Sequence, residues 1–215
     1  HAKNVVQIPG VGINSKEIEA QAVDVKKKRE ELGLSTEAIV ILSVGEMTKN
    51  KNQELIIRTV SEYKKKGERI CYALCGKGTE EEHLRGLAAE LDIENEVMFL
   101  GYHKDIYEVY KMADIFVFPS LREGMPVALM EAMASGLPVI CSDIRGNRDL
   151  LENEKGGVLV EGHKVEDYVK ALEWMVENKI SWEKMGDFNR RKAEKFDKKN
   201  VVGIMEKMYE AVKQK

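Results

Sequence analysis

Two glutamates eight residues apart, Glu123 and Glu131, have the spacing with the clearest chemical meaning in this sequence. Glu123 is predicted to lie in a loop, and Glu131 about one and a half turns inside the helix that follows. Carboxylates accept hydrogen bonds from sugar hydroxyls, and the predicted helix start at Gly124 and Met125 offers free backbone N–H groups to phosphate. The order of these groups matches a nucleotide diphosphate sugar, with Glu123 at the sugar and Glu131 at a ribose.

Five polar loops accompany these glutamates, each at the carboxyl end of a predicted strand. They span residues 45–51, 76–79, 101–104, 119–125 and 142–147, and each contains glycine. Ligands of parallel sheets bind beyond the carboxyl ends of the strands, and the helix starts beside such loops favour anions. The sequence holds neither the G-x-x-x-x-G-K-[ST] phosphate loop nor a G-x-G-x-x-G after its first strand, which weakens a nicotinamide dehydrogenase interpretation.

Alternating apolar runs and amphipathic stretches position these loops. Six strands are predicted at residues 39–44, 70–75, 97–100, 114–118, 138–141 and 157–160. Helices are predicted at residues 52–66, 79–91, 105–112, 126–135, 147–151 and 165–176. Thr79 and Glu82 have the spacing of a capping box. The alternation predicts an α/β, Rossmann-like domain: a six-stranded parallel sheet of order 3-2-1-4-5-6 with helices on both faces.

Two flanking segments differ from this α/β body, which is assigned to residues 38–178. Residues 1–37 are predicted to form an interdomain linker with an extended start and a charged helix near residues 24–32. Residues 179–215 are rich in lysine and arginine and are predicted to form C-terminal helices. The last helix, from about residue 200, carries Val201, Met205, Met208 and Val212 at helical spacing. It is expected to pack outside the domain and to show an apolar strip.

The composition is that of an ordinary globular chain. The 215 residues include 34 Lys+Arg and 37 Asp+Glu, a net charge of −3, which indicates neither a nucleic-acid-binding nor a disordered protein. No apolar run approaches the roughly 20 residues of a membrane-spanning helix. Cys71, Cys75 and Cys141 lack zinc-site spacing and are expected to be buried thiols in a reducing cytosol.

Several motifs together resemble family 4 of the glycosyltransferases, the retaining, group 1 enzymes of the GT-B fold. The glutamate pair matches the E-x7-E signature of that family, and the segment DIFVFPS at residues 114–120 precedes it as the family pattern requires. Residues 8–13 resemble the family's interdomain linker. Residues 44–45 with Lys51 resemble its first donor-domain strand and phosphate-binding lysine, and residues 99–102 resemble its base-binding turn. The resemblance covers nearly the whole chain and implies the carboxyl-terminal, donor-binding half of a longer enzyme. Independently, the first residue, His1 rather than methionine, leads us to expect a fragment of a longer protein.

The resemblance implies a role for each matching residue. Glu123 would contact the donor sugar, Glu131 would contact the ribose, and Lys51 would neutralise the diphosphate and stabilise it as a leaving group. The other residues expected at the nucleotide are Gly45, Gly101, Tyr102, Gly124 and Met125. Glu46 departs from the family pattern, because it stands where an arginine is usual and removes one of two cations expected at the diphosphate. The candidate replacements for that cation are Arg122, Lys49, Arg145 and Lys77, and His103 is a further candidate lining residue.

The resemblance implies a cytoplasmic retaining hexosyltransferase that takes the sugar of a nucleotide-sugar donor, expected to be a UDP-sugar. The sugar would pass to a polysaccharide or lipid-linked acceptor held by an amino-terminal domain, so the isolated chain is expected to bind donor without transferring sugar. Neither a metal nor a cofactor is expected beyond the donor. The alternatives are a GT-B sugar epimerase and a non-catalytic nucleotide-binding or interaction domain, which Glu46 favours. The basic segment 179–215 fits a solvated face or a peripheral contact with the inner face of a membrane.

Overall fold

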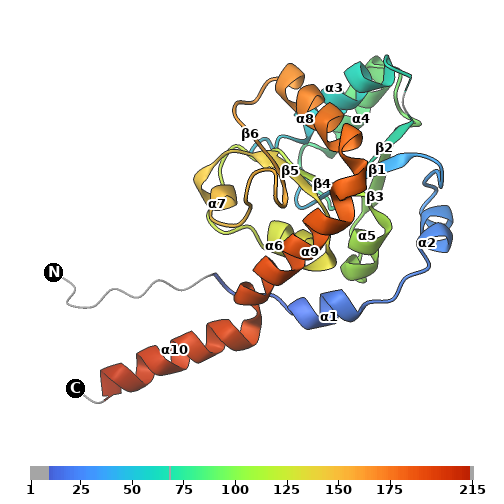
Figure 1. Cartoon of the computed structure of the whole chain (residues 1–215). Helices are drawn as coiled ribbons and strands as arrows, with labels where there is room; N and C mark the ends of the chain where they lie inside the picture. The colour runs from blue at the N-terminus through green and yellow to red at the C-terminus, as the bar shows by residue number, and fades with distance from the viewer. Residues whose placement is uncertain (1–9, 68, 214–215) are drawn as a thin grey trace.

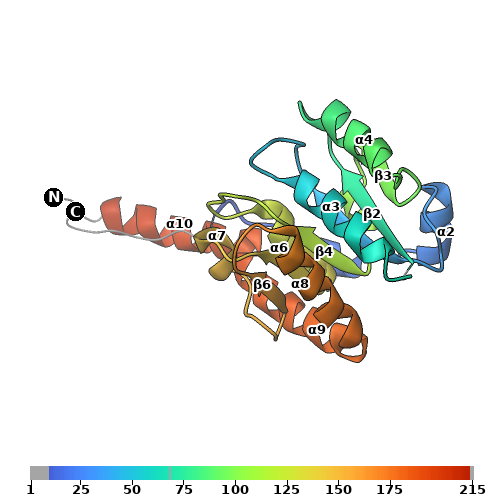
Figure 2. The same cartoon turned by 90° about the horizontal axis from the view of Figure 1, so that it is seen from above.

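The computed structural model describes residues 10–67 and 69–213, and its centre is the predicted six-stranded parallel sheet (Figure 1, Figure 2). The strands are β1 (Ile39–Val44), β2 (Ile70–Cys75), β3 (Val97–Gly101), β4 (Ile115–Phe118), β5 (Val139–Ser142) and β6 (Gly157–Val160). Their order, β3-β2-β1-β4-β5-β6, confirms the prediction. The order reverses between β1 and β4, so the loops that follow these two strands lie side by side. Ligands of open parallel sheets bind at such a point.

Both faces of the sheet are covered, which is why its strands are apolar almost throughout. Every residue of β2, β4 and β5 is buried. Along β1, Val40 and Leu42 belong to one apolar cluster and Ile41 belongs to the other, because successive side chains of a strand point to opposite faces. The predicted sandwich of helix, sheet and helix is therefore confirmed.

The helices form one layer on each face of the sheet, seen above and below it in Figure 1. On the face of Ile41 lie α3 (Gln53–Lys64), α4 (Glu81–Glu90) and α8 (Val165–Glu177). On the face of Leu42 lie α1 (Ser15–Ala20), α5 (Ile106–Met112), α6 (Val127–Ser135) and the end of α9 (Trp182–Ala193). The remaining elements are α2 (Val25–Glu31), α7 (Arg145–Arg148), α10 (Lys198–Lys213) and the 3-10 turns η1 (Lys179–Ser181) and η2 (Glu194–Phe196).

Arg29 anchors α2 to the sheet. Its side chain is buried, and its Nη2 atom lies 2.8 Å from Asp114 Oδ2. Its Nε–H donates to the carbonyl oxygen of Met112 (2.8 Å), and Asp114 Oδ2 also accepts from the backbone N–H of Val40 (2.7 Å). The buried charge is thus both paired and hydrogen-bonded, as the cost of removing it from water requires.

Five of the six predicted helix starts differ from the structure by one or two residues, those of α3 and α5 by one. Helix α4 begins at Glu81 and no side chain caps it, so the predicted capping box does not form. Helix α6 begins at Val127 because Pro126, in an extended conformation, takes the N-cap position; the helix does end at Gly136 in a left-handed conformation, as predicted. The short helix expected at residues 147–151 is α7, at Arg145–Arg148.

Helix α10 extends away from the rest of the molecule (Figure 1, Figure 2). It begins at Lys198, close to the predicted start. Val201 near its root is buried, whereas Val202 and Tyr209 are 50% and 57% exposed. The other members of the predicted apolar strip are Met205 and Met208, which are half-buried, and Val212, which lies outside the described side chains. The strip is therefore covered at its first position, and its docking on another domain stays a prediction.

Candidate functional site

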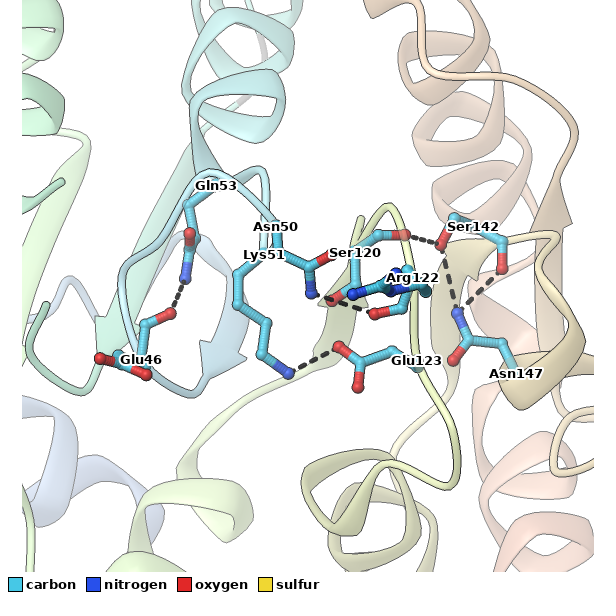
Figure 3. Close-up of polar contacts among 9 residues, drawn as sticks. All are labelled: Glu46, Asn50, Lys51, Gln53, Ser120, Arg122, Glu123, Ser142 and Asn147. Atoms are coloured by element: carbon cyan, nitrogen blue, oxygen red, sulfur yellow. Dashed lines mark hydrogen bonds and ion pairs between the residues drawn. The ribbon is translucent and has the colours of Figure 1, made fainter. Parts of the chain in front are cut away.

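Lys51 and Glu123 meet at the carboxyl ends of β1 and β4. Lys51 lies in the loop between β1 and α3, and Glu123 lies in the loop between β4 and α6. The Lys51 Nζ atom is 2.6 Å from Glu123 Oε1, and the two side chains are 23% and 13% exposed (Figure 3). Two residues 72 apart in the sequence thus form a partly buried ion pair at the point where ligands of this fold bind.

The two loops that carry this pair are joined by their backbones. The N–H of Leu121 donates to the carbonyl oxygen of Asn50 (2.8 Å), and the Asn50 side chain donates to the carbonyl oxygen of Arg122 (3.0 Å). The stem of Lys51 crosses Gly45, since a Cβ atom added to this glycine would lie 3.7 Å from Lys51 Cε. These contacts fix the ammonium group beside Glu123.

An aromatic ring supports the lysine from the sheet. The Lys51 Nζ atom lies 4.7 Å from the centroid of the Phe118 ring, within the range of a cation–π contact. Phe118 is the last residue of β4 and is buried. The ring and the carboxylate of Glu123 therefore hold the ammonium together.

The Glu123 loop rests on the loop that follows β5. A Cβ atom added to Gly146 would lie 2.5 Å from Gly124 O and 2.7 Å from Glu123 O, so only glycine fits there. The Ser142 hydroxyl donates to Ser120 O (2.6 Å), and the Asn147 side chain donates to Ser142 O (2.9 Å). The Asn147 bond holds α7 close to the end of β5.

Glu131 lies apart from the Lys51–Glu123 pair and faces α5. Its Oε2 atom accepts a hydrogen bond from the Tyr110 hydroxyl (3.1 Å), and Tyr110 is fully buried. Burial raises the pKa of Glu131 above its ordinary value, and the hydrogen bond from Tyr110 opposes that shift. The second oxygen of this carboxylate has no hydrogen bond among those found within the described part of the chain.

A cleft of about 650 Å³ lies beyond the ends of β1, β2 and β3. Its lining includes Gly45, Tyr102 and His103, so two predicted nucleotide residues and the additional histidine share one cavity. Tyr102 is 76% exposed. Gly101, next to it, has a φ of 68°, a left-handed conformation that suits glycine and turns the chain out of β3.

Gly124 and Met125 do not form the helix start that was predicted for them. They lie in the loop before α6, and the first free N–H groups of that helix belong to Val127 and its successors. Gly124 is exposed, and a Cβ atom there would meet nothing within 4 Å. Met125 packs against Gly10, since a Cβ atom on that glycine would lie 3.0 Å from Met125 Sδ.

Glu46 is exposed and lines the 650 Å³ cleft, turned away from the Lys51–Glu123 pair (Figure 3). Its carbonyl oxygen accepts from the side chain of buried Gln53 (3.1 Å), which holds the loop in place. Of the candidate replacement cations, Lys77 lines the same cleft, whereas Lys49 lines a separate pocket between α3 and α4. The other two candidates, Arg122 and Arg145, are exposed.

Several supporting residues were not predicted from the sequence. Tyr110 and Phe118 look like core aromatics, because both lie in apolar stretches. Their contacts with Glu131 and Lys51 depend on how helices and strands pack. Asn50 carried a weak signal, as a side chain with hydrogen-bonding capacity next to the proposed phosphate lysine.

Within residues 10–67 and 69–213, no group of three or more histidine, cysteine or carboxylate side chains could hold a metal ion. Within the same residues, no helix is long and apolar enough to cross a membrane. The three cysteines, Cys71, Cys75 and Cys141, are buried free thiols, as predicted.

Residues 24–194 match the family model described as glycosyl transferases, group 1. The chain belongs to this family. Among curated group 1 relatives, it is 27% identical to the putative glycosyltransferase EpsD of Bacillus subtilis over 206 residues, which are 95% of this chain and 54% of EpsD. It is 32% identical over 161 residues to a UDP-Gal:alpha-D-GlcNAc-diphosphoundecaprenol alpha-1,3-galactosyltransferase of Escherichia coli, covering 73% of this chain and 41% of the relative. The chain thus spans about half the length of the curated relatives it matches.

Solved glycosyltransferase structures share the fold of this group 1 chain. HepE of Anabaena, crystallised in complex with UDP, superposes with a TM-score of 0.83 at 21% identity, covering 95% of this chain and 56% of HepE. The pneumococcal O-GlcNAc transferase GtfA, in complex with UDP and GlcNAc, gives a TM-score of 0.75 at 23% identity, covering 83% of this chain and 37% of GtfA. These likenesses confirm the predicted GT-B type of fold.

Proposed function

We propose that this chain is the donor-binding part of a retaining glycosyltransferase that takes a hexose from a UDP-sugar. The observation that carries the proposal is the meeting of Lys51 and Glu123 at the ends of β1 and β4. A cation for a diphosphate and an acceptor for sugar hydroxyls stand side by side there, next to a cleft large enough for a nucleoside.

Similar proteins support a UDP-sugar as the donor. A relative from Escherichia coli is named for its use of UDP-Gal, and HepE has been crystallised with UDP-glucose. A saccharide or lipid-linked acceptor agrees with the diphosphoundecaprenol in that relative's name. A cytoplasmic location and a peripheral membrane contact stay predictions for this chain.

Each residue of the site has a distinct task in the proposed reaction. Lys51 and the free N–H groups at the start of α6 would hold the diphosphate and stabilise the charge that develops as it leaves. Glu123 would accept hydrogen bonds from the hydroxyls of the sugar, and Glu131 from those of the ribose. The cleft beside Gly101 and Tyr102 would take the base.

Transfer also requires an acceptor hydroxyl held near the anomeric carbon. Such positioning supplies about 7–11 kcal/mol of barrier lowering. We propose that a further domain, outside this chain, provides it and docks on α10, so that the chain alone binds donor without transferring sugar. NMR of the product of the complete enzyme gives the test of retention, because an inverted anomeric configuration would contradict the family 4 assignment.

The two alternatives predicted from the sequence are less well supported. A non-catalytic domain was favoured by Glu46, but the group 1 match and the paired Lys51 and Glu123 favour a donor-binding site. An epimerase does not account for this family match. Lys77, in the same cleft as Glu46, is the best-placed cation to compensate for the missing arginine.

Thermal unfolding with UDP, GDP or ADP tests the donor class. A ligand at about 100 times its dissociation constant adds about 2.7 kcal/mol to the free energy of unfolding. We expect UDP to stabilise the chain most of the three. Absence of stabilisation by these nucleotides and by UDP-glucose would refute the proposed function.

Substitution of Glu131 tests its place in the site. Glu131→Ala should weaken UDP binding by about 1.5–3 kcal/mol, the range for a hydrogen bond to a charged group. Glu62→Ala is the matched control, because Glu62 is an exposed helical glutamate paired only with Lys65 among the ion pairs of the described residues. Equal effects of the two substitutions would contradict the ribose assignment.

A further inference from the structure

We propose that the Lys51–Glu123 ion pair makes this site select a diphosphate that carries a sugar over a bare nucleoside diphosphate. The inference rests on the proposed function. It adds that Glu123 opposes binding of the bare nucleotide, in addition to contacting the sugar.

The cation of the site is already paired before a ligand arrives. Lys51 Nζ lies 2.6 Å from Glu123 Oε1, and both side chains are more than three-quarters buried. Salt and water screen a pair in such surroundings less than they screen a surface pair. A diphosphate that approaches Lys51 therefore meets an ammonium whose charge Glu123 has neutralised.

Lys51 has little freedom to turn away from Glu123 when it contacts a ligand. Its stem crosses Gly45, and its ammonium group lies over the ring of Phe118. The diphosphate must therefore bind next to the carboxylate of Glu123, or draw the ammonium away and leave that carboxylate without its cation. In the first case Lys51 offers the diphosphate a charge that Glu123 already neutralises, and in the second case a partly buried carboxylate is left without a partner, so both are unfavourable.

A sugar on the diphosphate removes this penalty. Its hydroxyl groups donate hydrogen bonds, and an ionised carboxylate only accepts them. A nucleotide-sugar thus brings new partners for Glu123 when it takes Lys51, whereas UDP brings none. The ion pair should therefore weaken binding of the spent nucleotide more than binding of the donor, which favours exchange of product for fresh donor.

A double-mutant cycle on the 215-residue chain tests the inference, with UDP and UDP-glucose as probes in isothermal titration calorimetry. Glu123→Gln keeps the shape of the side chain and frees Lys51. We expect this variant to bind UDP roughly tenfold more tightly than the wild type, which corresponds to about 1.4 kcal/mol, and to bind UDP-glucose more weakly.

The second arm repeats the Glu123→Gln change in a chain with Lys51→Met. If Glu123 acts through Lys51, the gain in UDP affinity should disappear in that background. Simple repulsion between Glu123 and the diphosphate would leave the gain intact there, and this result would overturn the inference. Unchanged or weaker UDP binding by the single Glu123→Gln variant would overturn it too.

The outcomes separate this inference from the proposed function. If the wild-type chain binds neither UDP-glucose nor any of UDP, GDP and ADP, then the donor-binding function fails and the inference fails with it. If the wild type binds UDP and UDP-glucose but the cycle shows no coupling between Lys51 and Glu123, then only the selectivity role is refuted. Circular dichroism of each variant checks that the fold is retained.

Discussion

A methyl group added at Gly146 would press on the loop that carries Glu123. The added Cβ atom would lie 2.5 Å from Gly124 O and 2.7 Å from Glu123 O, whereas ordinary contact begins at 3.4 Å. The Gly124 carbonyl must therefore move by about 0.9 Å, because the added Cβ atom and the carbonyl oxygen cannot overlap. Displacements of about 1 Å in a positioned catalytic group can lower rates about 100-fold.

Gly146→Ala should thus reduce both stability and sugar recognition. Overpacking of this kind typically costs about 1–3 kcal/mol in the free energy of unfolding. Urea denaturation measures that loss, and calorimetry should show a larger loss of affinity for UDP-glucose than for UDP, since Glu123 is the group displaced. In the complete enzyme, turnover should fall by up to about 100-fold.

Gly86→Ala provides the matched control for this experiment. Gly86 lies inside α4, and a Cβ atom there meets nothing within 4 Å. The control should be about 0.5–1 kcal/mol more stable than the wild type, because alanine suits a helix better than glycine. If Gly146→Ala kept both its unfolding free energy and its UDP-glucose affinity, the claim that this glycine positions the Glu123 loop would be wrong.

Three other expectations concern buried or titrating groups. Arg29→Met should lower the free energy of unfolding in urea by about 3–5 kcal/mol, because it leaves Asp114 without its buried cation; a loss below 1 kcal/mol would contradict this. Asp197→Ala should cost about 1 kcal/mol, since the Asp197 carboxylate accepts from the first turn of α10 and from Ser15. These bonds hold the pKa of Asp197 below its usual range. Their stabilising effect is therefore present above the unfolded-state pKa and is lost as the pH falls through the lower folded-state pKa. Acid titration of the unfolding free energy of wild type and variant measures this difference. Burial raises the pKa of Glu131, so the midpoint pH at which acidification weakens UDP binding should be higher than for an ordinary glutamate. Tyr110→Phe removes the hydrogen bond that opposes this shift and should move the midpoint higher still. A midpoint that stays in place would argue against the Tyr110 contact.

The sheet could be predicted because its signals are local and agree with one another. Each strand is an apolar run that ends in glycine, proline or a polar loop, and each helix has apolar residues at helical spacing. The right-handed crossover rule then leaves few possible strand orders. The helix starts were less predictable: Thr79 and Glu82 have capping-box spacing, yet the chain turns around Glu80 because the N–H of Glu80 donates to the carbonyl of Met47.

The charged residues of the candidate site could be predicted from the sequence, but the contacts that hold them in place could not. Lys51 and Glu123 stood out because they follow adjacent strands in a recognisable pattern. Their direct contact, the ring of Phe118 and the close approach of Gly146 depend on distances between elements that spacing along the chain does not encode. The Gly124–Met125 helix start was predicted wrongly because Pro126 was assigned to the first turn of α6 and instead forms its N-cap.

The joint at the root of α10 links two distant parts of the chain mechanically. Ile13 N–H donates to Phe196 O (2.9 Å), and Lys198 N–H donates to Ile13 O (2.8 Å), so residues beside α1 and α10 must move together. The sixteen residues of α10 make a lever about 24 Å long. A rotation of about 10° at its root would carry the far end by about 4 Å, given that length. A small rearrangement at Ile13 therefore displaces the far end of α10 much further than it moves the hydrogen-bonded atoms at the root of the helix.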